Sequence, residues 1–383
     1  MVTLHTAYTI EADDADYAFQ EIMEQLQLES NQKKYSVGMI FCHTDFTESG
    51  VAQAISKKMP FDVIGITFVG TMTQDMDDPL MLAFSLFTSD EVEFSTIKVE
   101  NLAEEGAMAQ AYAEAVSDHL CPPALIMAYF PLTMPRSVES FLEELDEASN
   151  NTPVYGGIAV DFTPDYSLWQ VLYNGEISRN IISAILFFGD IQPQFFTSTM
   201  SNKYVQTHKS IITKSEKNIL MEVNDKPFIE YLYDNGFEKG VSGAGLGGTP
   251  MLIDFDDGTP PISRGVAGLT PEGYAVMPGE APAGALISLG SIDYAHVLDM
   301  TEEVVRSAMN SGKKGPVIIH PCASHLLLMG VGVQEQKDNI RRFINLDFNY
   351  AVGYSGGEIC PVYDSNGMIK NRLHSYTFVL CIL

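Results

Sequence analysis

The stretch Gly353-Tyr-Ser-Gly-Gly-Glu-Ile-Cys-Pro361 closes an apolar, strand-like run that contains Phe348, Tyr350 and Val352. Three glycines, one carboxylate and one thiol therefore crowd the end of a strand. Glycine at such a place permits a positive φ, or a close approach by another backbone or a ligand. The turn can hold Glu358 at the rim of a sheet, either as part of a ligand site or as the exposed residue of an ordinary glycine-rich turn.

The same arrangement occurs three times along the chain. Each copy has a continuously apolar strand, an amphipathic helix, a glycine-bearing strand and a closing apolar strand. The first strands are residues 37–42, 124–130 and 316–322, the helices 47–59, 137–148 and 333–344, the glycine-bearing strands 61–70, 153–162 and 348–354, and the closing strands 80–87, 181–188 and 373–383. The pattern predicts an α/β (mixed α+β) fold, in which repeated β-α-β-β units form mixed sheets covered by helices. The spacing leaves open whether the copies share one sheet.

The segments between the copies add further expected elements. Apolar residues at helical spacing predict helices over 13–29 and 102–119, and a third over 299–310, with Asp299 or Thr301 as its N-cap. Asn174-Gly175 predicts a hairpin between residues 168–173 and 181–188. The glycine cluster 240–249 is expected to be a flexible loop, or a lid over a pocket.

Composition limits the class of partner. The chain has 383 residues, of which 46% are hydrophobic, and its 22 Lys plus Arg against 50 Asp plus Glu give a net charge of −28. A negative field of this size repels phosphate backbones and anionic lipid headgroups, so we expect neither a nucleic-acid nor a membrane partner. No apolar run approaches the length of a membrane span and the start has no signal-peptide pattern, so the expected location is the cytoplasm. The five scattered cysteines favour buried thiols over disulfides.

Four stretches together resemble the FIST family (F-box and intracellular signal transduction). They are Val63-Ile-Gly-Ile-Thr67, Pro153-Val-Tyr-Gly-Gly-Ile-Ala-Val-Asp161, Val317-Ile-Ile-His-Pro-Cys322 and Gly353–Pro361. The most specific matches are the Gly357-Glu358 pair and the cysteine that ends a strand, Cys322. The resemblance implies an N-terminal FIST domain over residues 32–226 and a C-terminal FIST domain over 227–383, after an N-terminal helical extension over 1–31.

The resemblance implies a cytoplasmic sensory module that binds a small ligand, with amino acids as the suggested class, and passes the signal on. Such modules occur beside kinase, cyclase, methyl-accepting or F-box segments. We expect no output domain in this chain, so signalling would need a separate protein partner. Ser324 and His325 stand where the cysteine strand of the family is often followed by Arg.

The expected ligand site lies where the glycine-ended strands converge. Glu358 would receive a cationic or amino group, or pair with Arg372, because a buried carboxylate needs a cation. Backbone N–H groups around Gly156 and Gly357 would receive an anionic group. The full set of expected ligand-binding residues is Tyr155, Gly156, Gly157, Cys322, His325, Gly357, Glu358 and Arg372.

Two other functions stay open. Cys322 with His320 or His325 as base would make a hydrolase or transferase, but no third orienting group can be named, and no catalytic constellation is expected. The chain could instead be an adaptor that binds a protein without any small ligand. No cofactor or metal site is expected, since no converging set of three or four ligands is evident.

Overall fold

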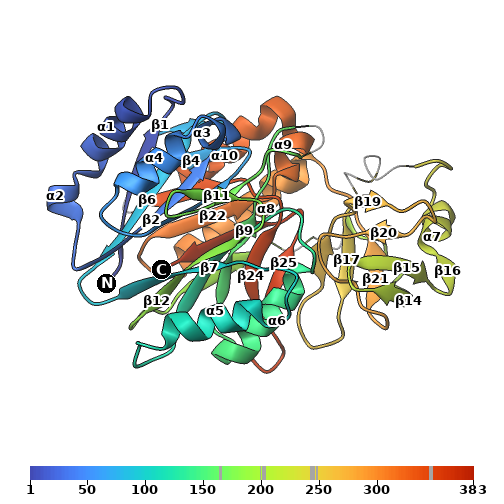
Figure 1. Ribbon diagram of the computed structural model, residues 1–383. Coiled ribbons are helices and arrows are strands. Elements are labelled where there is room, and N and C mark those ends of the chain that lie inside the picture. The colour runs from blue at the N-terminus through green and yellow to red at the C-terminus, as the bar shows by residue number, and fades with distance from the viewer. Residues whose placement is uncertain (164–165, 199, 201–203, 242–245, 247–248, 345–347) are drawn as a thin grey trace.

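The computed structural model describes residues 1–163, 166–198, 200, 204–241, 246, 249–344 and 348–383, and its main body uses one motif three times (Figure 1). Each unit begins with an edge strand, a helix and a central strand. A helical crossover then leads to a strand parallel to the central strand, and a hairpin and a closing strand follow. The helical crossover is what parallel neighbours require, and the closing strand returns antiparallel.

The elements of the units follow one another in chain order. Unit 1 contains β1 (Thr3–Thr9), α1 (Ala15–Leu26), α2 (Leu28–Asn31), β2 (Tyr35–Cys42), α3 (Thr44–Glu48), α4 (Val51–Lys58), β3 (Val63–Thr67), β4 (Thr71–Thr73), β5 (Asp77–Asp78) and β6 (Leu82–Ser89). Unit 2 contains β7 (Glu93–Val99), α5 (Ala107–Val116), β8 (Leu125–Phe130), α6 (Val138–Ser149), β9 (Val154–Ile158), β10 (Val171–Tyr173), β11 (Glu176–Ser178) and β12 (Ile182–Phe188). Unit 3 contains β13 (Gln194–Thr197), α8 (Tyr294–Asn310), β22 (Val317–Pro321), α9 (Ser324–Met329), α10 (Val333–Phe343), β23 (Tyr350–Gly353), β24 (Glu358–Tyr363), β25 (Ile369–His374) and β26 (Phe378–Ile382).

Each unit contributes four strands to a six-stranded mixed sheet of its own, and a hairpin of another unit supplies the other two. The strand orders are β1-β6-β2-β3-β10-β11, β7-β12-β8-β9-β24-β25 and β13-β26-β22-β23-β4-β5. The predicted mixed fold of repeated units is therefore confirmed, and the copies do not share a sheet. The helices lie on the outer faces of the three sheets, while the inner faces meet in one apolar core (Figure 1).

The units exchange their hairpins in a cycle. The hairpin β4-β5 of unit 1 extends the sheet of unit 3, β10-β11 of unit 2 extends that of unit 1, and β24-β25 of unit 3 extends that of unit 2. Asn174-Gly175 does form a hairpin turn, but it joins β10 to β11, whereas β12 pairs with β7 and β8. The dipeptide predicts the turn but not the partner strand of the hairpin, because each of these hairpins pairs with a strand of another unit.

Backbone hydrogen bonds fix which residues are equivalent between units. The N–H of Phe68, Ala159 and Ser355 each donates to the last carbonyl of the central strand of its own unit, at 2.9, 2.8 and 2.9 Å. One residue farther along, the donors turn to the neighbouring unit: Val69 N bonds Tyr354 O, Gly356 N bonds Ile158 O, and Val160 N bonds Thr67 O. These three bonds close a ring around a pseudo-threefold axis.

A triangle of rings fills the centre of this body. Phe41, Tyr129 and His320 occupy equivalent positions on the three central strands, with ring centroids 5.4 to 5.7 Å apart. His320 Nδ1 lies 3.1 Å from Gly353 O and its Nε2 lies 3.3 Å from the Tyr129 hydroxyl. Because a carbonyl only accepts, Nδ1 carries the hydrogen, and the lone pair of Nε2 faces the Tyr129 hydroxyl, which also contacts Met39 Sδ at 3.2 Å. Burial lowers the pKa of His320 to about 4, so it is a neutral core residue.

A second lobe is inserted into unit 3 between β13 and α8, and lies at the right of Figure 1. Its strands pair in the order β18-β17-β21-β14-β15-β20-β19, with β16 beside β15. The elements are β14 (Ser210–Glu216), β15 (Ile219–Val223), β16 (Lys226–Pro227), α7 (Phe228–Asp234), β17 (Met251–Asp254), β18 (Ile262–Arg264), β19 (Gly268–Leu269), β20 (Ala275–Val276) and β21 (Leu286–Leu289). Most of the predicted glycine loop, at 242–245 and 247–248, lies outside the described residues.

Several predicted boundaries change. Residues 1–31 hold α1 and α2 but also β1, which pairs along its whole length with β6, so this segment is part of sheet 1 rather than only a helical extension. The predicted helix 47–59 is divided into α3 and α4 at Gly50, whose φ is +88°. Helix α8 begins at Tyr294, with Asp293 as its cap, a full turn before the predicted start. Within the described ranges, no helix is long and apolar enough to cross a membrane.

Candidate functional site

Glu358 lies at the first position of β24, where that strand enters the sheet of unit 2 opposite Gly157. Its side chain is fully buried. Ser355 Oγ lies 2.9 Å from Oε1, and the Thr377 hydroxyl donates to Oε2 at 2.8 Å. Burial raises the pKa of Glu358 to about 8, although both hydroxyl contacts oppose the shift. The sequence therefore placed this carboxyl correctly at a sheet rim, but the rim is enclosed.

Cys322 joins the same cluster from the end of β22. Its N–H donates to Thr377 O at 3.0 Å, and the next residue, Ala323, donates to Ser355 O at 2.7 Å. Burial, and then the adjacent Glu358 charge, raise the pKa of the Cys322 thiol above its usual range. A nucleophilic cysteine needs a thiolate, so this environment disfavours the reactive-thiol hypothesis.

The predicted glycines allow strands to approach each other. A Cβ on Gly156 would lie 1.8 Å from Ala128 O, and one on Gly157 would lie 3.0 Å from Ser355 Cβ. Gly357 accepts from Ile158 N at 2.9 Å, and a Cβ there would meet Ile158 and Leu373 side chains at 3.0 and 3.1 Å. Gly156 thus lets β9 lie against β8, and Gly157 and Gly357 let β24 lie against β9 with Ser355 close to Glu358.

Three other predicted residues lie apart from Glu358. The Tyr155 hydroxyl lies 2.8 Å from Ile318 O and 3.1 Å from Val379 O, inside the central core. His325 Nδ1 lies 3.1 Å from Gln336 Nε2, and burial lowers its pKa to about 4. Arg372 forms an ion pair with Asp257 of the inserted lobe. The expected Arg372–Glu358 pair is therefore wrong, because Asp257 supplies the carboxylate.

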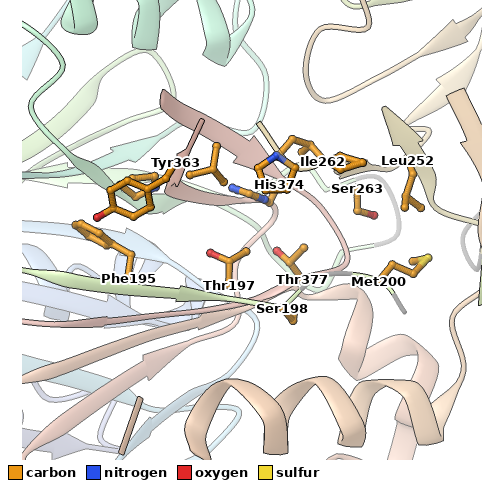
Figure 2. Close-up of a pocket in the computed structure, with 14 residues that line it drawn as sticks. Phe195, Thr197, Ser198, Met200, Leu252, Ile262, Ser263, Tyr363, His374 and Thr377 are labelled. Carbon is orange, nitrogen blue, oxygen red and sulfur yellow. The ribbon is translucent and has the colours of Figure 1, made fainter. Parts of the chain in front are cut away.

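A cavity of about 250 Å³ lies beside the buried cluster, between the threefold body and the inserted lobe (Figure 2). Body residues along it come from β13, β24, β25 and the turn before β26, and lobe residues come from β17 and β18. The lining residues are Phe195, Thr197, Ser198, Met200, Leu252, Pro260, Pro261, Ile262, Ser263, Pro361, Val362, Tyr363, His374 and Thr377. Thr377 connects the two features, because it lines the cavity and its hydroxyl hydrogen is directed to Glu358.

Much of the polar wall of the cavity can only accept hydrogen bonds, because its side chains already donate their hydrogens to other protein groups. His374 Nε2 lies 3.1 Å from Cys360 O, so Nε2 carries the hydrogen and Nδ1 keeps a lone pair. Burial lowers the pKa of His374 to about 3, which keeps the ring neutral. The Thr197 hydroxyl donates to Cys360 Sγ and that of Thr377 to Glu358, so each has only lone pairs left. The Ser198 and Ser263 hydroxyls can still rotate to donate or accept.

The remaining described wall is uncharged and, apart from the Tyr363 hydroxyl, apolar. Phe195, Leu252, Ile262 and Val362 supply hydrocarbon surface, and three prolines contribute no N–H donors. None of the described lining residues carries a charge at neutral pH. The sequence did not point to His374 or Thr377 as site residues, because neither belongs to a motif and the inserted lobe completes the cavity only in three dimensions.

Comparison with known families accounts for the first half of the chain. Residues 36–226 match the model of the FIST N domain. The chain belongs to the FIST family. FIST domains are sensory domains of signal transduction. No curated protein matches the chain. The matched segment of this FIST protein covers unit 1 from β2 onward, all of unit 2, β13 of unit 3 and the start of the inserted lobe. The Glu358 cluster therefore lies beyond it.

The threefold body of this FIST protein provides an internal control for the cluster. Strand registers and the ring of hydrogen bonds align Cys322, Ser355, Glu358 and Thr377 of unit 3 with Pro131, Ala159, Val171 and Ile181 of unit 2. In unit 1 the same positions are His43, Phe68, Thr71 and Met81. All four positions of unit 2 are buried and apolar. The fold therefore closes without a carboxyl group at this position.

Proposed function

We propose that this protein is a cytoplasmic sensor whose cavity binds a small ligand with an apolar body and an amino group. The observation that supports this most is the contrast between units 2 and 3. Burying a carboxyl group costs free energy that apolar filling avoids. Unit 2 uses apolar filling at the equivalent positions, while unit 3 keeps Glu358, Ser355 and Thr377 at the wall of a cavity.

The acceptor surface favours a ligand that donates hydrogen bonds. His374 Nδ1, Thr377 Oγ1 and Thr197 Oγ1 offer lone pairs, whereas the described side-chain donors that a ligand carboxylate would meet are the hydroxyls of Ser198, Ser263 and Tyr363. An ammonium group also gains from the net charge of −28 and from Glu358 behind Thr377. Cys322 and Gly357 belong to the layer behind the wall, while Tyr155, Gly156 and Gly157 hold that layer in place.

The size of the cavity favours a metabolite of few atoms. Its volume of about 250 Å³ lies below the range typical of sites for drug-sized ligands. Hydrocarbon from Phe195, Leu252 and Val362 would cover the apolar body of the ligand. An apolar amino compound fits these walls, and amino acids remain the class suggested by the family.

The position of the cavity suggests how binding is transmitted. Its walls come from two lobes, so an occupant contacts both and favours their present arrangement by its differential affinity. The lobes are also joined by the Arg264–Glu139 and Arg372–Asp257 pairs and by Ser137 Oγ, which donates to Glu280 Oε1 at 2.7 Å. We propose that a separate signalling protein recognises this arrangement.

A matched pair of probes tests the proposal. 3-Methylbutylamine and 3-methylbutanoate have similar bodies, but one presents a donor-only ammonium and the other an acceptor-only carboxylate. In calorimetry and thermal unfolding of the full chain, we expect the amine to bind and to raise the melting temperature, and the carboxylate to do neither. Thr377→Val should weaken the amine response, while Thr96→Val, far from the cavity, should not. Binding of neither probe, or of the carboxylate alone, contradicts the proposal.

A further inference from the structure

Ser355 has more acceptor neighbours than it has hydrogens. Its hydroxyl oxygen lies 2.9 Å from Glu358 Oε1 and 3.1 Å from Gly357 O. A carbonyl and a carboxylate both accept only, whereas the hydroxyl has one hydrogen. If Glu358 were ionised, one of the two contacts would place lone pairs against each other. If Glu358 carries a proton on Oε1, both contacts become hydrogen bonds: Glu358 donates to Ser355, and Ser355 donates to Gly357.

The other carboxyl oxygen is already saturated with donors. Oε2 accepts from the Thr377 hydroxyl at 2.8 Å and from Thr377 N at 3.4 Å. A proton on this oxygen would face two donors, so the contacts assign it to Oε1. Thr377 therefore donates to Oε2 whether or not Glu358 is ionised, and it presents lone pairs to the cavity in both states.

Among the residues that the structure describes, none supplies a counter-charge to an ionised Glu358. The titratable groups around it are Cys322 at the end of β22, Cys360 on its own strand, His374 across the ladder on β25, and Tyr376 in the next turn. Burial keeps both thiols and Tyr376 protonated and the imidazole neutral. From β9, Gly157 brings no side chain. The nearest cations, Arg264 and Arg372, are paired with Glu139 and Asp257.

We propose that Glu358 is protonated in the ligand-free protein and releases its proton when a cationic group occupies the cavity, so that ligand binding is coupled to proton release. This inference rests on the proposed function for the identity of the ligand group. The step balances as a protonated carboxyl plus a free ammonium giving a carboxylate with a bound ammonium and one proton in solvent. Glu358 is a positioning residue, because Thr377 stands between it and the cavity.

Proton release would also reverse one hydrogen bond at the centre of the fold. With Glu358 ionised, the Ser355 hydrogen turns from Gly357 O to Oε1. Gly357 O then keeps only the bond from Ile158 N of unit 2, next to the ring that joins the three units. Ligand binding in the cavity thus has a defined local consequence at the junction of units 2 and 3.

Infrared spectroscopy tests the protonation without any ligand. At pH 7 we expect a carbonyl band of a protonated carboxylic acid in the wild-type protein that disappears in Glu358→Gln and persists in Glu139→Gln, the control for the other buried glutamate of raised pKa. Loss of the band in neither variant, or only in Glu139→Gln, overturns the proposal whether or not a ligand binds.

Calorimetry tests the coupling on the unmodified chain. Titration with 3-methylbutylamine at pH 7, in phosphate and in Tris, should reveal release of close to one proton per bound amine. The affinity should rise about tenfold per pH unit below the pKa of Glu358 and level off above it, because each unit of pH removes one competing proton. Amine binding with no proton release overturns this inference and leaves the proposed function standing, whereas absence of amine binding contradicts the proposed function.

Discussion

Units 2 and 3 have the same strand order and the same junction with a neighbouring hairpin, yet they fill the junction differently. Unit 2 places Ala159, Val171 and Ile181 there, while unit 3 places Ser355, Glu358 and Thr377. Both sets are buried. Since one backbone accepts either set, the requirements of folding alone do not account for the polar set. The apolar residues of unit 2 show what folding requires at this junction, and we attribute the polar residues of unit 3 to the cavity.

The largest expected effect is on what the three units share. Phe41 is fully buried between Tyr129, His320 and Phe68, at the centre of all three sheets. Truncation of a core phenylalanine to Ala costs about 3–5 kcal/mol through lost burial and the cavity left behind. We expect Phe41→Ala to lower the free energy of unfolding in urea by this amount, and Ser355→Ala to lower it far less. Equal losses of unfolding free energy in the two variants would mean that the polar residues of unit 3 stabilise the fold as much as the shared core does.

The next effect concerns the inserted lobe, which only unit 3 contains. Arg264 is fully buried and forms an ion pair with Glu139 of α6 at 2.5 Å. Burial raises the pKa of Glu139 and lowers that of Arg264, because each charge has lost its water. Removing one partner leaves a buried charge, so Arg264→Met should cost about 3–5 kcal/mol in urea unfolding.

The double variant Arg264→Met/Glu139→Leu is the matched control for that pair. It removes both charges and keeps similar volumes, so it should recover most of the stability lost by the single variant. If the double variant is as unstable as the single one, the unpaired charge of Glu139 is not the cause of the instability of Arg264→Met.

A smaller, pH-dependent effect distinguishes Glu358 from its apolar counterpart. Its pKa is raised from 4.5 to about 8 in the folded chain, so the stabilising preference for the proton is complete below pH 4.5 and is lost as pH rises toward 8. Glu358→Gln keeps the neutral shape and cannot ionise. As pH rises across this window, the free energy of unfolding of Glu358→Gln should therefore increase relative to that of the wild type by up to about 1.4 kcal/mol per pH unit.

Urea unfolding from pH 5 to about 9 measures this difference. The buried histidines titrate in the opposite direction, since burial lowers the pKa values of His320, His325 and His374, but they are common to both proteins and cancel. Parallel stability profiles for the two proteins would mean that Glu358 keeps an ordinary pKa.

The smallest expected effect separates two threonines on the same wall. Thr377→Val removes a lone pair from the cavity and leaves Glu358 Oε2 with one donor fewer, so 3-methylbutylamine should bind about tenfold more weakly, in line with about 1–2 kcal/mol for one hydrogen bond. Thr197→Val removes a lone pair but leaves only a thiol behind, and should cost less. Calorimetric titration compares them, and a larger loss in Thr197→Val would move the ligand contact away from Glu358.

The sequence predicted the three repeated units but not the exchange of hairpins between them. Apolar runs and glycine-ended strands identified the three β-α-β-β units, because these patterns are local. The exchange of hairpins depends on pairing between strands far apart in the chain, so Asn174-Gly175 revealed a turn but not its neighbour β3. Glu358 and Cys322 were predicted to lie in one site because each was expected at the end of a strand of the third copy. His374, Thr377 and Asp257 were missed because the inserted lobe and the return of β25 bring them to the site.

The most direct test of the account is to give unit 3 the filling of unit 2. The variant Ser355→Ala/Glu358→Val/Thr377→Ile copies the residues of the equivalent buried positions, Ala159, Val171 and Ile181. Its free energy of unfolding in urea and its response to 3-methylbutylamine would be measured on the same preparation. We expect a folded chain, at least as stable as the wild type at pH 8, that no longer binds the amine. A chain that unfolds, or that is folded and binds the amine as the wild type does, would contradict the account.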